Sequence, residues 1–274
     1  MTLGVTLLRE FIDAADARRI LILSGAGLST ESGIPDYRGP SGVLHRHAPM
    51  NFHAFLTDPV ARHRYWARSY LGWPRIARAR PNAGHRAVAD LQEAGAVGAV
   101  ITQNVDGLHQ AAGSDLVLEL HGGLDRTVCL GCRHRAARRE LHDRLRAANP
   151  GFGAAVDEVN PDGDVETPDA DLAGFRMVDC LACGGGPLKP DVVFFGENVP
   201  RERVERCYGL VEDAAAMVVL GSSLTVLSGF RFVRHAARHA IPVAIVNQGR
   251  TRGDPLAALC VDAALGQVLP ALAG

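Results

Sequence analysis

Lysine is almost absent from this sequence. Of the 29 basic residues in a chain of 274, only Lys189 is a lysine and the other 28 are arginines; a GC-rich genome is the simplest explanation. Thirty acidic residues bring the net charge to −1, whereas nucleic-acid-binding domains usually carry a clustered positive excess. We therefore expect no nucleic-acid partner.

Long apolar runs are also missing. No stretch of 18 consecutive apolar residues occurs, so the sequence predicts no membrane-spanning helix and no membrane partner. The N-terminus has no basic segment, and Arg9 and Glu10 interrupt the apolar residues that a signal peptide would need. We expect a cytoplasmic protein.

Apolar residues nevertheless make up 47% of the chain, enough for a sizeable core in one large domain or two modest ones. Short apolar runs typical of buried parallel strands cover residues 19–24, 96–102, 216–220 and 242–246. Helical patterns alternate with them at 3–17, 84–94 and 229–239. This alternation predicts an α/β fold with a doubly wound, mostly parallel, Rossmann-like sheet, whose ligand binds where the strands end.

Two segments interrupt the alternation. Residues 46–80, rich in aromatic residues and arginine, predict a small helical insertion, and residues 126–186 contain two Cys-x-x-Cys pairs. The remaining parts, 1–45, 81–125 and 187–274, would then form the sheet domain.

The two pairs are Cys129/Cys132 and Cys180/Cys183. In a chain without a secretion signal, this spacing indicates metal binding before disulfides. Four thiolates close a tetrahedral zinc site and leave no position for water, which predicts a structural zinc. The alternative is four unrelated buried cysteines. The other two cysteines are expected to be ordinary core residues.

A glycine-rich turn follows the first predicted strand, at residues 25–33. Gly25 and Gly27 would let the backbone approach a pyrophosphate, whose charge the next helix N-terminus would stabilise. Thr30 stands where the dinucleotide-binding fingerprint has Gly or Ala, so the turn alone is equally compatible with one that binds no ligand. An ordinary dehydrogenase is poorly supported, because no acidic residue follows at the end of a clear second strand.

Asp36, Tyr37 and Arg38 come shortly after this turn. They would bring a carboxylate, an aromatic ring and a fixed cation close to the ribose of a ligand bound there. Such a set is unusual for a plain dinucleotide site.

From this point on the chain resembles the sirtuins, the NAD-dependent protein deacylases. The matching strings, in family order, are GAGLSTESGIPDYRG (25–39), TQNVDGLHQAAG (102–113), LELHGG (118–123), the two Cys-x-x-Cys pairs, LKPDVVFFGE (188–197), GSSLTV (221–226) and VNQG (246–249). The strings RYWAR, GWPR, PNAGH and LKPDVVFFGE resemble class II, the branch that includes the mitochondrial lipoamidase and ADP-ribosyltransferase sirtuin of animals. The resemblance makes the sheet domain an NAD-binding domain.

The resemblance implies a deacylase that transfers the acyl group of a lysine to the ribose of NAD, yielding nicotinamide and O-acyl-ADP-ribose, with acylated-lysine proteins as partners. It implies that Asn104 and Asp106 hold the nicotinamide, that Gln103 contacts the ribose, and that His121 is the base for the ribose hydroxyls. An imidazole is the side chain whose ordinary pKa lies near neutrality. Judged from the residues alone, Asn104 or Asp106 would equally serve to cap a helix.

The resemblance implies further contacts at the strand ends. The NAD contacts are Gly25, Ala26, Gly27, Ser29, Thr30, Asp36, Tyr37, Arg38, Gln103, Asn104, Asp106, Gly221, Ser222, Ser223, Thr225, Asn247, Gly249 and Leu265. The substrate backbone is expected to add as a strand along Val192, Val193, Phe194, Phe195, Gly196 and Glu197, for which the alternative is a plain core strand. Tyr65 and Arg68 match a Tyr-x-x-Arg pattern with which some sirtuins grip acidic acyl groups; the alternative is a solvated arginine on a helix.

Three other functions stay open. A protein mono-ADP-ribosyltransferase would use the same activated ribose, and a non-catalytic NAD- and zinc-binding interaction module would use only the binding residues. The presence of Asn104, Asp106 and His121 disfavours that module, because a pure binder needs no base there. A hydride-transfer dehydrogenase lacks a clean fingerprint.

Overall fold

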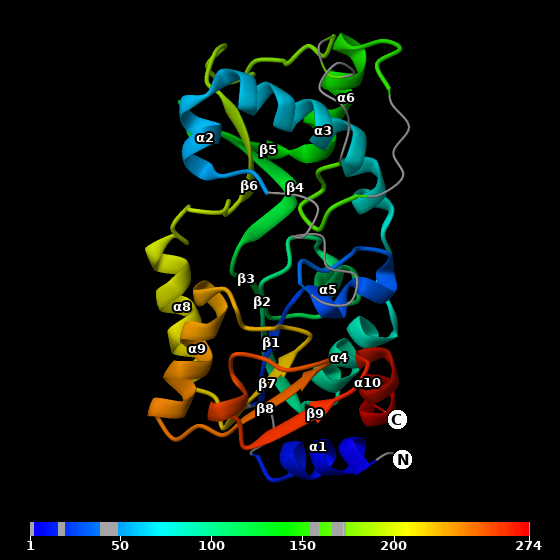
Figure 1. Ribbon diagram of the computed structural model, residues 1–274, viewed down its shortest axis with the longest axis vertical. Coiled ribbons are helices and arrows are strands. Elements are labelled where there is room, and N and C mark those ends of the chain that lie inside the picture. Colours follow the sequence, from blue (N-terminus) through cyan, green and yellow to red (C-terminus); the bar gives the residue numbers. More distant parts are fainter. Residues whose placement is uncertain are drawn as a thin grey trace.

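The computed structural model describes residues 3–15, 20–38, 49–153, 159–165, 172 and 174–273. Along the long axis of the molecule, a smaller body is stacked on a larger α/β body (Figure 1). The first and last helices, α1 (Leu3–Asp13) and α10 (Leu265–Ala273), both lie in the larger body.

Six strands form the sheet of the larger body, in the order β3, β2, β1, β7, β8, β9. Their bounds are Ile20–Ser24 (β1), Val97–Thr102 (β2), Val117–Glu119 (β3), Ala216–Leu220 (β7), Val243–Asn247 (β8) and Leu259–Asp262 (β9). All five neighbouring pairs are parallel. The four predicted strands are confirmed, as is the Rossmann-like parallel sheet; Arg19, which the sequence adds to the first strand, lies outside the described residues.

Alternate residues of β1 face opposite sides of the sheet. Ile20 and Ile22 join the core beneath α1, α10 and α4 (Ala83–Glu93). Leu21 and Leu23 join the core beneath α8 (Arg201–Glu212) and α9 (Leu227–Arg238). Burial on both faces explains why these strands are continuous apolar runs. The predicted helices 84–94 and 229–239 are confirmed to within two residues, and the helix predicted over 3–17 ends at Asp13.

The smaller body is built on three antiparallel strands in the order β5 (Arg135–Ala137), β4 (Gly122–Cys129), β6 (Leu188–Val192). Helix α6 (Arg138–Ala148) packs beside β4, and α2 (Phe52–Thr57) and α3 (Pro59–Arg78) complete this body (Figure 1). The predicted helical insertion is thus confirmed over α2 and α3, while residues 46–48 lie outside the described part. The Asn51 and Asp58 side chains accept backbone N–H bonds at the starts of these two helices, as N-caps do.

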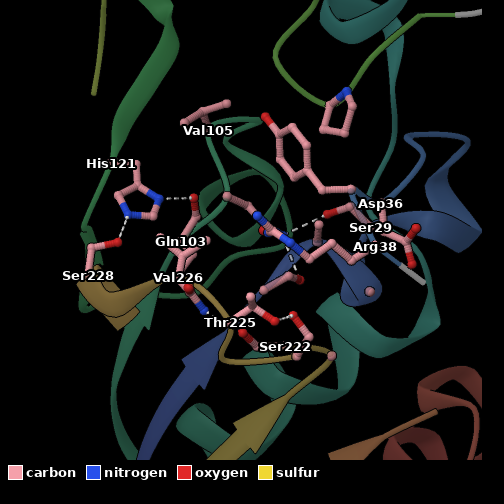
Figure 2. Close-up of a pocket in the computed structure, with 18 of the residues that line it drawn as sticks. Ser29, Asp36, Arg38, Gln103, Val105, His121, Ser222, Thr225, Val226 and Ser228 are labelled. Carbon is pink, nitrogen blue, oxygen red and sulfur yellow. Dashed lines mark hydrogen bonds between the residues drawn. The ribbon is translucent and has the colours of Figure 1, made fainter. Parts of the chain in front are cut away.

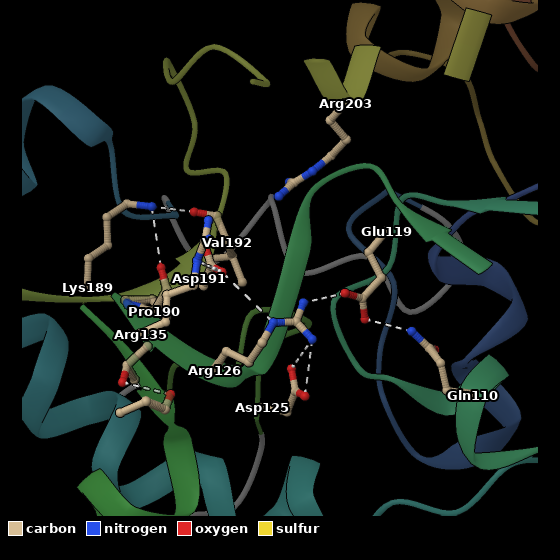
Figure 3. A network of polar contacts seen from close by, with 12 residues as sticks. Gln110, Glu119, Asp125, Arg126, Arg135, Lys189, Pro190, Asp191, Val192 and Arg203 are labelled. Carbon is tan, nitrogen blue, oxygen red and sulfur yellow. Dashed lines mark hydrogen bonds and ion pairs between the residues drawn. The ribbon is translucent and has the colours of Figure 1, made fainter. Parts of the chain in front are cut away.

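β4 carries the chain from the larger sheet to the smaller one. Arg126 of β4 pairs with Glu119 of β3 on one side, and its Nε lies 3.9 Å from an Asp191 carboxylate oxygen of β6 on the other (Figure 3). Gly122 begins β4 with a φ of 81°, and a side chain there would collide with the Asp191 carbonyl. The two bodies are therefore joined closely at this strand.

The division of the chain into domains stays a prediction. β6 belongs to the stretch 187–274 that the sequence assigns to the larger domain, yet it hydrogen-bonds with β4 in the smaller sheet. Among the described residues, none of the helices combines the length and the hydropathy needed to cross a membrane.

Candidate active site

A cavity of about 720 Å³ opens where β1, β2, β7 and β8 end, at the junction with the smaller body. This edge is where a doubly wound sheet binds its ligand. Every residue predicted to contact NAD lines the cavity except Gly249. Asn104, Asp106 and His121 line it as well, so the structure brings the predicted catalytic residues together.

His121 lies between the end of β3 and the start of β4. Its Nδ1 is 2.8 Å from the Gln103 carbonyl oxygen, and its Nε2 is 2.8 Å from the Ser228 hydroxyl (Figure 2). A carbonyl oxygen only accepts hydrogen bonds, so in the neutral imidazole Nδ1 carries the proton and Nε2 carries the lone pair. The backbone of Gln103 therefore determines which nitrogen of His121 is available to accept a proton.

The environment of His121 keeps it neutral at pH 7. Burial lowers the pKa of His121 below its ordinary value, the Gln103 carbonyl partly opposes this, and the positive charges of Arg203 and Arg231 lower it further. A general base must be deprotonated before it acts. The imidazole is therefore in the form that proton abstraction requires.

Asn104 and Asp106 are tied together through Ser29. The Ser29 hydroxyl donates to an Asp106 carboxylate oxygen at 2.7 Å and accepts from the Asn104 amide at 3.0 Å. The Asn104 amide also donates to the Gly25 carbonyl at 3.0 Å. The loops after β1 and β2 thus hold both side chains at one place in the cavity wall.

Asp106 has two roles. One carboxylate oxygen binds Ser29, and the other accepts the backbone N–H of Leu108 at 2.9 Å, at the start of α5 (Leu108–Ala111). The capping alternative is wrong: the N-cap of α5 is Gly107, without a side-chain cap, and Asp106 accepts the Leu108 N–H from the position before it. Burial raises the pKa of Asp106, against the lowering by the Ser29 and Leu108 hydrogen bonds.

The glycines of the first loop are required by backbone packing. A Cβ on Gly25 would lie 2.7 Å from Ser222 Cβ, and one on Gly27 would lie 2.9 Å from the Gly221 carbonyl oxygen. The loops after β1 and β7 pack against each other at this point, so both loops reach the same end of the cavity. This close approach suits a site where backbone N–H groups meet a pyrophosphate.

The predicted helix N-terminus beside this loop is wrong. Between β1 and Arg38 the chain forms only two single 3-10 turns, η1 (Ala26–Leu28) and η2 (Thr30–Ser32). Gly33, with a φ of 79°, ends the second turn. The donors available to a phosphate are therefore the N–H groups of short turns, without the dipole of a long helix.

Two side chains organise the later loops. The Gln103 amide donates to the Ser222 hydroxyl at 2.8 Å, which links the loops after β2 and β7. The Asn247 amide donates to the carbonyls of Gln248 and Gly249 at 2.9 and 3.0 Å. Gly249 has a φ of 80° and does not line the cavity. It instead shapes the turn from which Asn247 and Gln248 reach the cavity wall.

The segment 192–197 is a strand only in part, because β6 covers Val192 and, of the other five residues, Phe195 alone makes a bridge, to Asn51. The addition of a substrate strand along this segment stays a prediction. β6 ends at Val192, and Gly196, with a φ of 79°, turns the chain so that the Glu197 N–H donates to the Phe194 carbonyl at 3.0 Å. All six residues nevertheless line the cavity. The Val193 N–H donates to the His121 carbonyl at 2.8 Å, so this segment lies directly beside His121.

Tyr65 and Arg68 are not brought to the cavity wall. Tyr65 is only 1% exposed and packs its ring against Phe55 and Phe194, with ring centroids 5.5 and 5.2 Å apart. Burial raises the pKa of its hydroxyl. A grip on an acyl carboxylate by these two residues finds no support in their positions, whereas Asp162 places a carboxylate in the lining.

The four paired cysteines fit a zinc ion. Their sulfur atoms all lie within 4.8 Å of one another, with Cys129 and Cys183 3.7 Å apart and Cys132 and Cys180 3.8 Å apart. Zinc–sulfur bonds of about 2.3 Å in a tetrahedron place sulfurs about 3.8 Å apart. The site lies at the far end of β4 from His121, so the metal is structural.

The other two cysteines differ from each other. Cys207 is fully buried, as predicted for a core residue. Cys260 is exposed on β9, the edge strand of the larger sheet, so its prediction as a core residue is wrong. An edge strand has a neighbour on one side only, which leaves its side chains closer to solvent.

Ser228 and Arg231 belong to the candidate site, and the sequence analysis missed them. Both lie on α9 and line the cavity, and both act on His121. The matching string GSSLTV ends two residues before Ser228. A helix N-terminus after a strand-end motif was the only signal that pointed to them.

Known proteins with similar sequences point to the same kind of site. Residues 25–228 match the model of the Sir2 family. The NAD-dependent protein deacetylase 1 of Streptomyces coelicolor is 58% identical over 270 residues, covering 98% of this chain and 90% of that protein. The NAD-dependent protein deacetylase 1 of Mycobacterium avium is 49% identical over 278 residues, covering 100% of this chain and 97% of that protein.

Solved Sir2 structures share the fold. One with a p53 peptide and NAD⁺ superposes with a TM-score of 0.76 at 30% identity, covering 98% of this chain and 96% of its own. Another, a variant with deacetylated p53 peptide and 3′-O-acetyl-ADP-ribose, gives a TM-score of 0.78 at 30% identity, covering 98% and 97%. Since the family match spans most of the chain and these relatives are covered almost end to end, the chain belongs to the Sir2 family, the sirtuins.

Proposed function

We propose that this protein is an NAD-dependent protein-lysine deacylase that releases nicotinamide and forms O-acyl-ADP-ribose. The observation that carries the proposal is the His121 site. A neutral imidazole presents its basic Nε2 to a cavity that is also lined by Asn104, Asp106 and the segment Val193–Glu197. The relatives named as deacetylases support the same activity.

In this proposal each residue has a defined task. NAD, when bound, supplies the ribose carbon that receives the acyl oxygen, and nicotinamide is its leaving group. Asn104 and Asp106, fixed by Ser29, hold the carboxamide of the nicotinamide. His121 accepts a proton at Nε2 from the ribose hydroxyls, a contribution of about 10²–10⁴ in rate for a positioned base.

We also propose which groups bind elsewhere in the cavity. The loops of Gly25–Thr30 and Gly221–Thr225 bind the pyrophosphate and ribose, and Asn247 and Leu265 bind the adenosine end. The acylated lysine peptide lies along Val192–Glu197, next to His121. The hydrogen bond from the Val193 N–H to the His121 carbonyl supports this placement, because it holds the segment that would bind the peptide next to the proposed base.

The acyl group that fits best is neutral, such as acetyl. Tyr65 and Arg68 do not reach the cavity, while the Asp162 carboxylate lines it. The lining also holds the cations Arg38 and Arg231, so the preference for a neutral acyl group rests on the position of Tyr65 and Arg68 away from the cavity wall. We also propose that the protein belongs to class II, on the strings RYWAR, GWPR, PNAGH and LKPDVVFFGE, and that it is cytoplasmic.

The test is a panel of acetyl-, succinyl- and glutaryl-lysine peptides with NAD, followed by mass spectrometry. Wild type should release nicotinamide and O-acyl-ADP-ribose, with acetyl-lysine equal to or better than the acidic acyl groups. His121→Ala should form almost no O-acyl-ADP-ribose. Nicotinamide release that does not depend on acyl-lysine would instead indicate ADP-ribosyl transfer.

A further inference from the structure

A second cluster of metal-ligand side chains lies far from the cysteines, where α8 and α9 end. Glu212 is the last residue of α8, and His235 and His239 lie at the end of α9. One ligand atom from each of the three lies within 4.8 Å of the others. Nothing in the proposed deacylase chemistry uses these residues.

The arrangement suits chelation. His235 and His239 are four residues apart at the end of one helix, so their rings lie on the same face, with centroids 4.2 Å apart. Nε2 of His235 is 2.8 Å from a Glu212 carboxylate oxygen, so the third donor comes from the neighbouring helix. Two imidazoles and a carboxylate therefore converge from two packed elements.

The cluster is open to solvent on one side and supported on the other. The Glu212 and His235 side chains are 54% and 17% exposed. The Tyr208 ring of α8 packs against His235 with centroids 4.6 Å apart, and against Phe232 at 5.1 Å. This aromatic packing holds α8 and α9 together and orients the His235 ring, while an ion has access from the surface.

We propose that Glu212, His235 and His239 form a second metal site, for a divalent transition ion such as zinc or nickel. Two imidazole nitrogens favour such ions over calcium or magnesium, which prefer an all-oxygen donor set. Three protein ligands leave coordination positions for water. The ion is therefore exchangeable, unlike the zinc enclosed by four thiolates.

An ion at this site would bridge the two helices that flank the catalytic histidine. Near the opposite end of α8, Arg203 donates to the Leu120 carbonyl at 3.2 Å. At the start of α9, Ser228 contacts His121. The site thus ties together the ends of α8 and α9 that lie away from the cavity, and metal binding should stabilise the larger body (Figure 1).

The test uses tag-free, zinc-loaded protein of full length, titrated with nickel by calorimetry without NAD or peptide. Wild type should bind one nickel ion per chain and show a raised Tm, with the zinc content unchanged. Replacing one ligand should weaken nickel binding at least about tenfold, since even outer-shell changes cost 10–100-fold. His239→Ala and Glu212→Gln are the variants, and His53→Ala, at an exposed histidine of α2, is the matched control.

Two outcomes would overturn the proposal. One is a zinc-loaded wild-type protein that binds no nickel in addition to its zinc. The other is nickel binding in His239→Ala and Glu212→Gln that equals that of His53→Ala. Because the measurement needs no turnover, it is independent of whether the deacylase proposal holds.

Discussion

The Ser228 hydroxyl lies 2.8 Å from Nε2 of His121, the nitrogen that carries the lone pair. A donor at this position stabilises the neutral imidazole, and so does burial. It also occupies the nitrogen that receives the ribose proton in the proposed mechanism. Ser228 therefore has to give way, or pass the proton on, when substrate binds.

Ser228→Ala should raise the pKa of His121, because the neutral form loses a hydrogen bond. The acid limb of the kcat/KM–pH profile should move to higher pH, with less than about a tenfold change in kcat/KM at pH 8, the usual weight of one neutral hydrogen bond. Ser228→Thr, which keeps the hydroxyl, should restore the profile. An unmoved acid limb in Ser228→Ala would contradict this role.

Lys189 should control peptide binding. Its ammonium is 2.9 Å from a Glu197 carboxylate oxygen and 4.5 Å from the centre of the Phe194 ring, and the lysine is 3% exposed. The same Glu197 oxygen accepts the Phe194 N–H at 2.8 Å. This one pair therefore fixes the turn that lies beside His121.

Lys189→Met should raise the KM for acyl-lysine peptide about tenfold while the KM for NAD stays within about twofold. Leaving the Glu197 carboxylate unpaired should also destabilise the protein by about 1–3 kcal/mol, less than the 3–5 kcal/mol of a fully buried pair because Glu197 is partly solvated. The double variant with Glu197→Gln should recover stability. Steady-state kinetics and urea unfolding give both readouts; an equal rise of both KM values would refute the assignment.

Removal of zinc should unfold the smaller body. Cys180→Ser should lose the metal and destabilise the protein far beyond the roughly 1 kcal/mol of a typical substitution, because structural zinc binding is coupled to folding. Zinc content and thermal unfolding measure the effect. Cys260→Ser, at the exposed cysteine of β9, should keep one zinc per chain; retention of zinc by Cys180→Ser would show that the four-cysteine site is not the zinc site.

Two buried histidines should make the protein acid-sensitive. Burial lowers the pKa of His85 to about 4 and that of His109 to about 3, whereas both have 6.5 when unfolded. The unfolded chain therefore binds more protons below pH 6.5. The free energy of unfolding therefore keeps its full value above pH 6.5 and decreases as the pH falls toward the folded pKa values of the two histidines.

Each of these histidines should contribute a slope of up to about 1.4 kcal/mol per pH unit to the free energy of unfolding below pH 6.5. Urea unfolding at pH 7, 6 and 5 measures this slope. His85→Gln should flatten it, while His53→Gln, at an exposed histidine, should leave it unchanged. A wild-type stability that is flat from pH 7 to pH 5 would be inconsistent with buried neutral histidines.

Much of the fold was predictable because its signals are local. A run such as 216–220 is apolar throughout, since both faces of a central parallel strand are covered. Asn104, Asp106 and His121 follow strand ends in matching strings, so their position in one cavity follows from the parallel sheet. The apolar pattern of Val192–Glu197 suggested a continuous strand. The chain turns instead at Gly196, whose positive φ the apolar residues alone do not reveal.

The sequence by itself determined the α/β class and the four-cysteine site, because strand periodicity and cysteine spacing are properties of neighbouring residues, and its resemblance to the sirtuins supplied the predicted catalytic set. Only the tertiary structure decided that Ser228 meets His121, that Lys189 holds Glu197 in the turn beside the base, and that Tyr65 lies in the core. It also brought Glu212 of one helix to His235 of another. These contacts depend on how separate elements pack, and no local pattern encodes the partner at the other side of a packed interface.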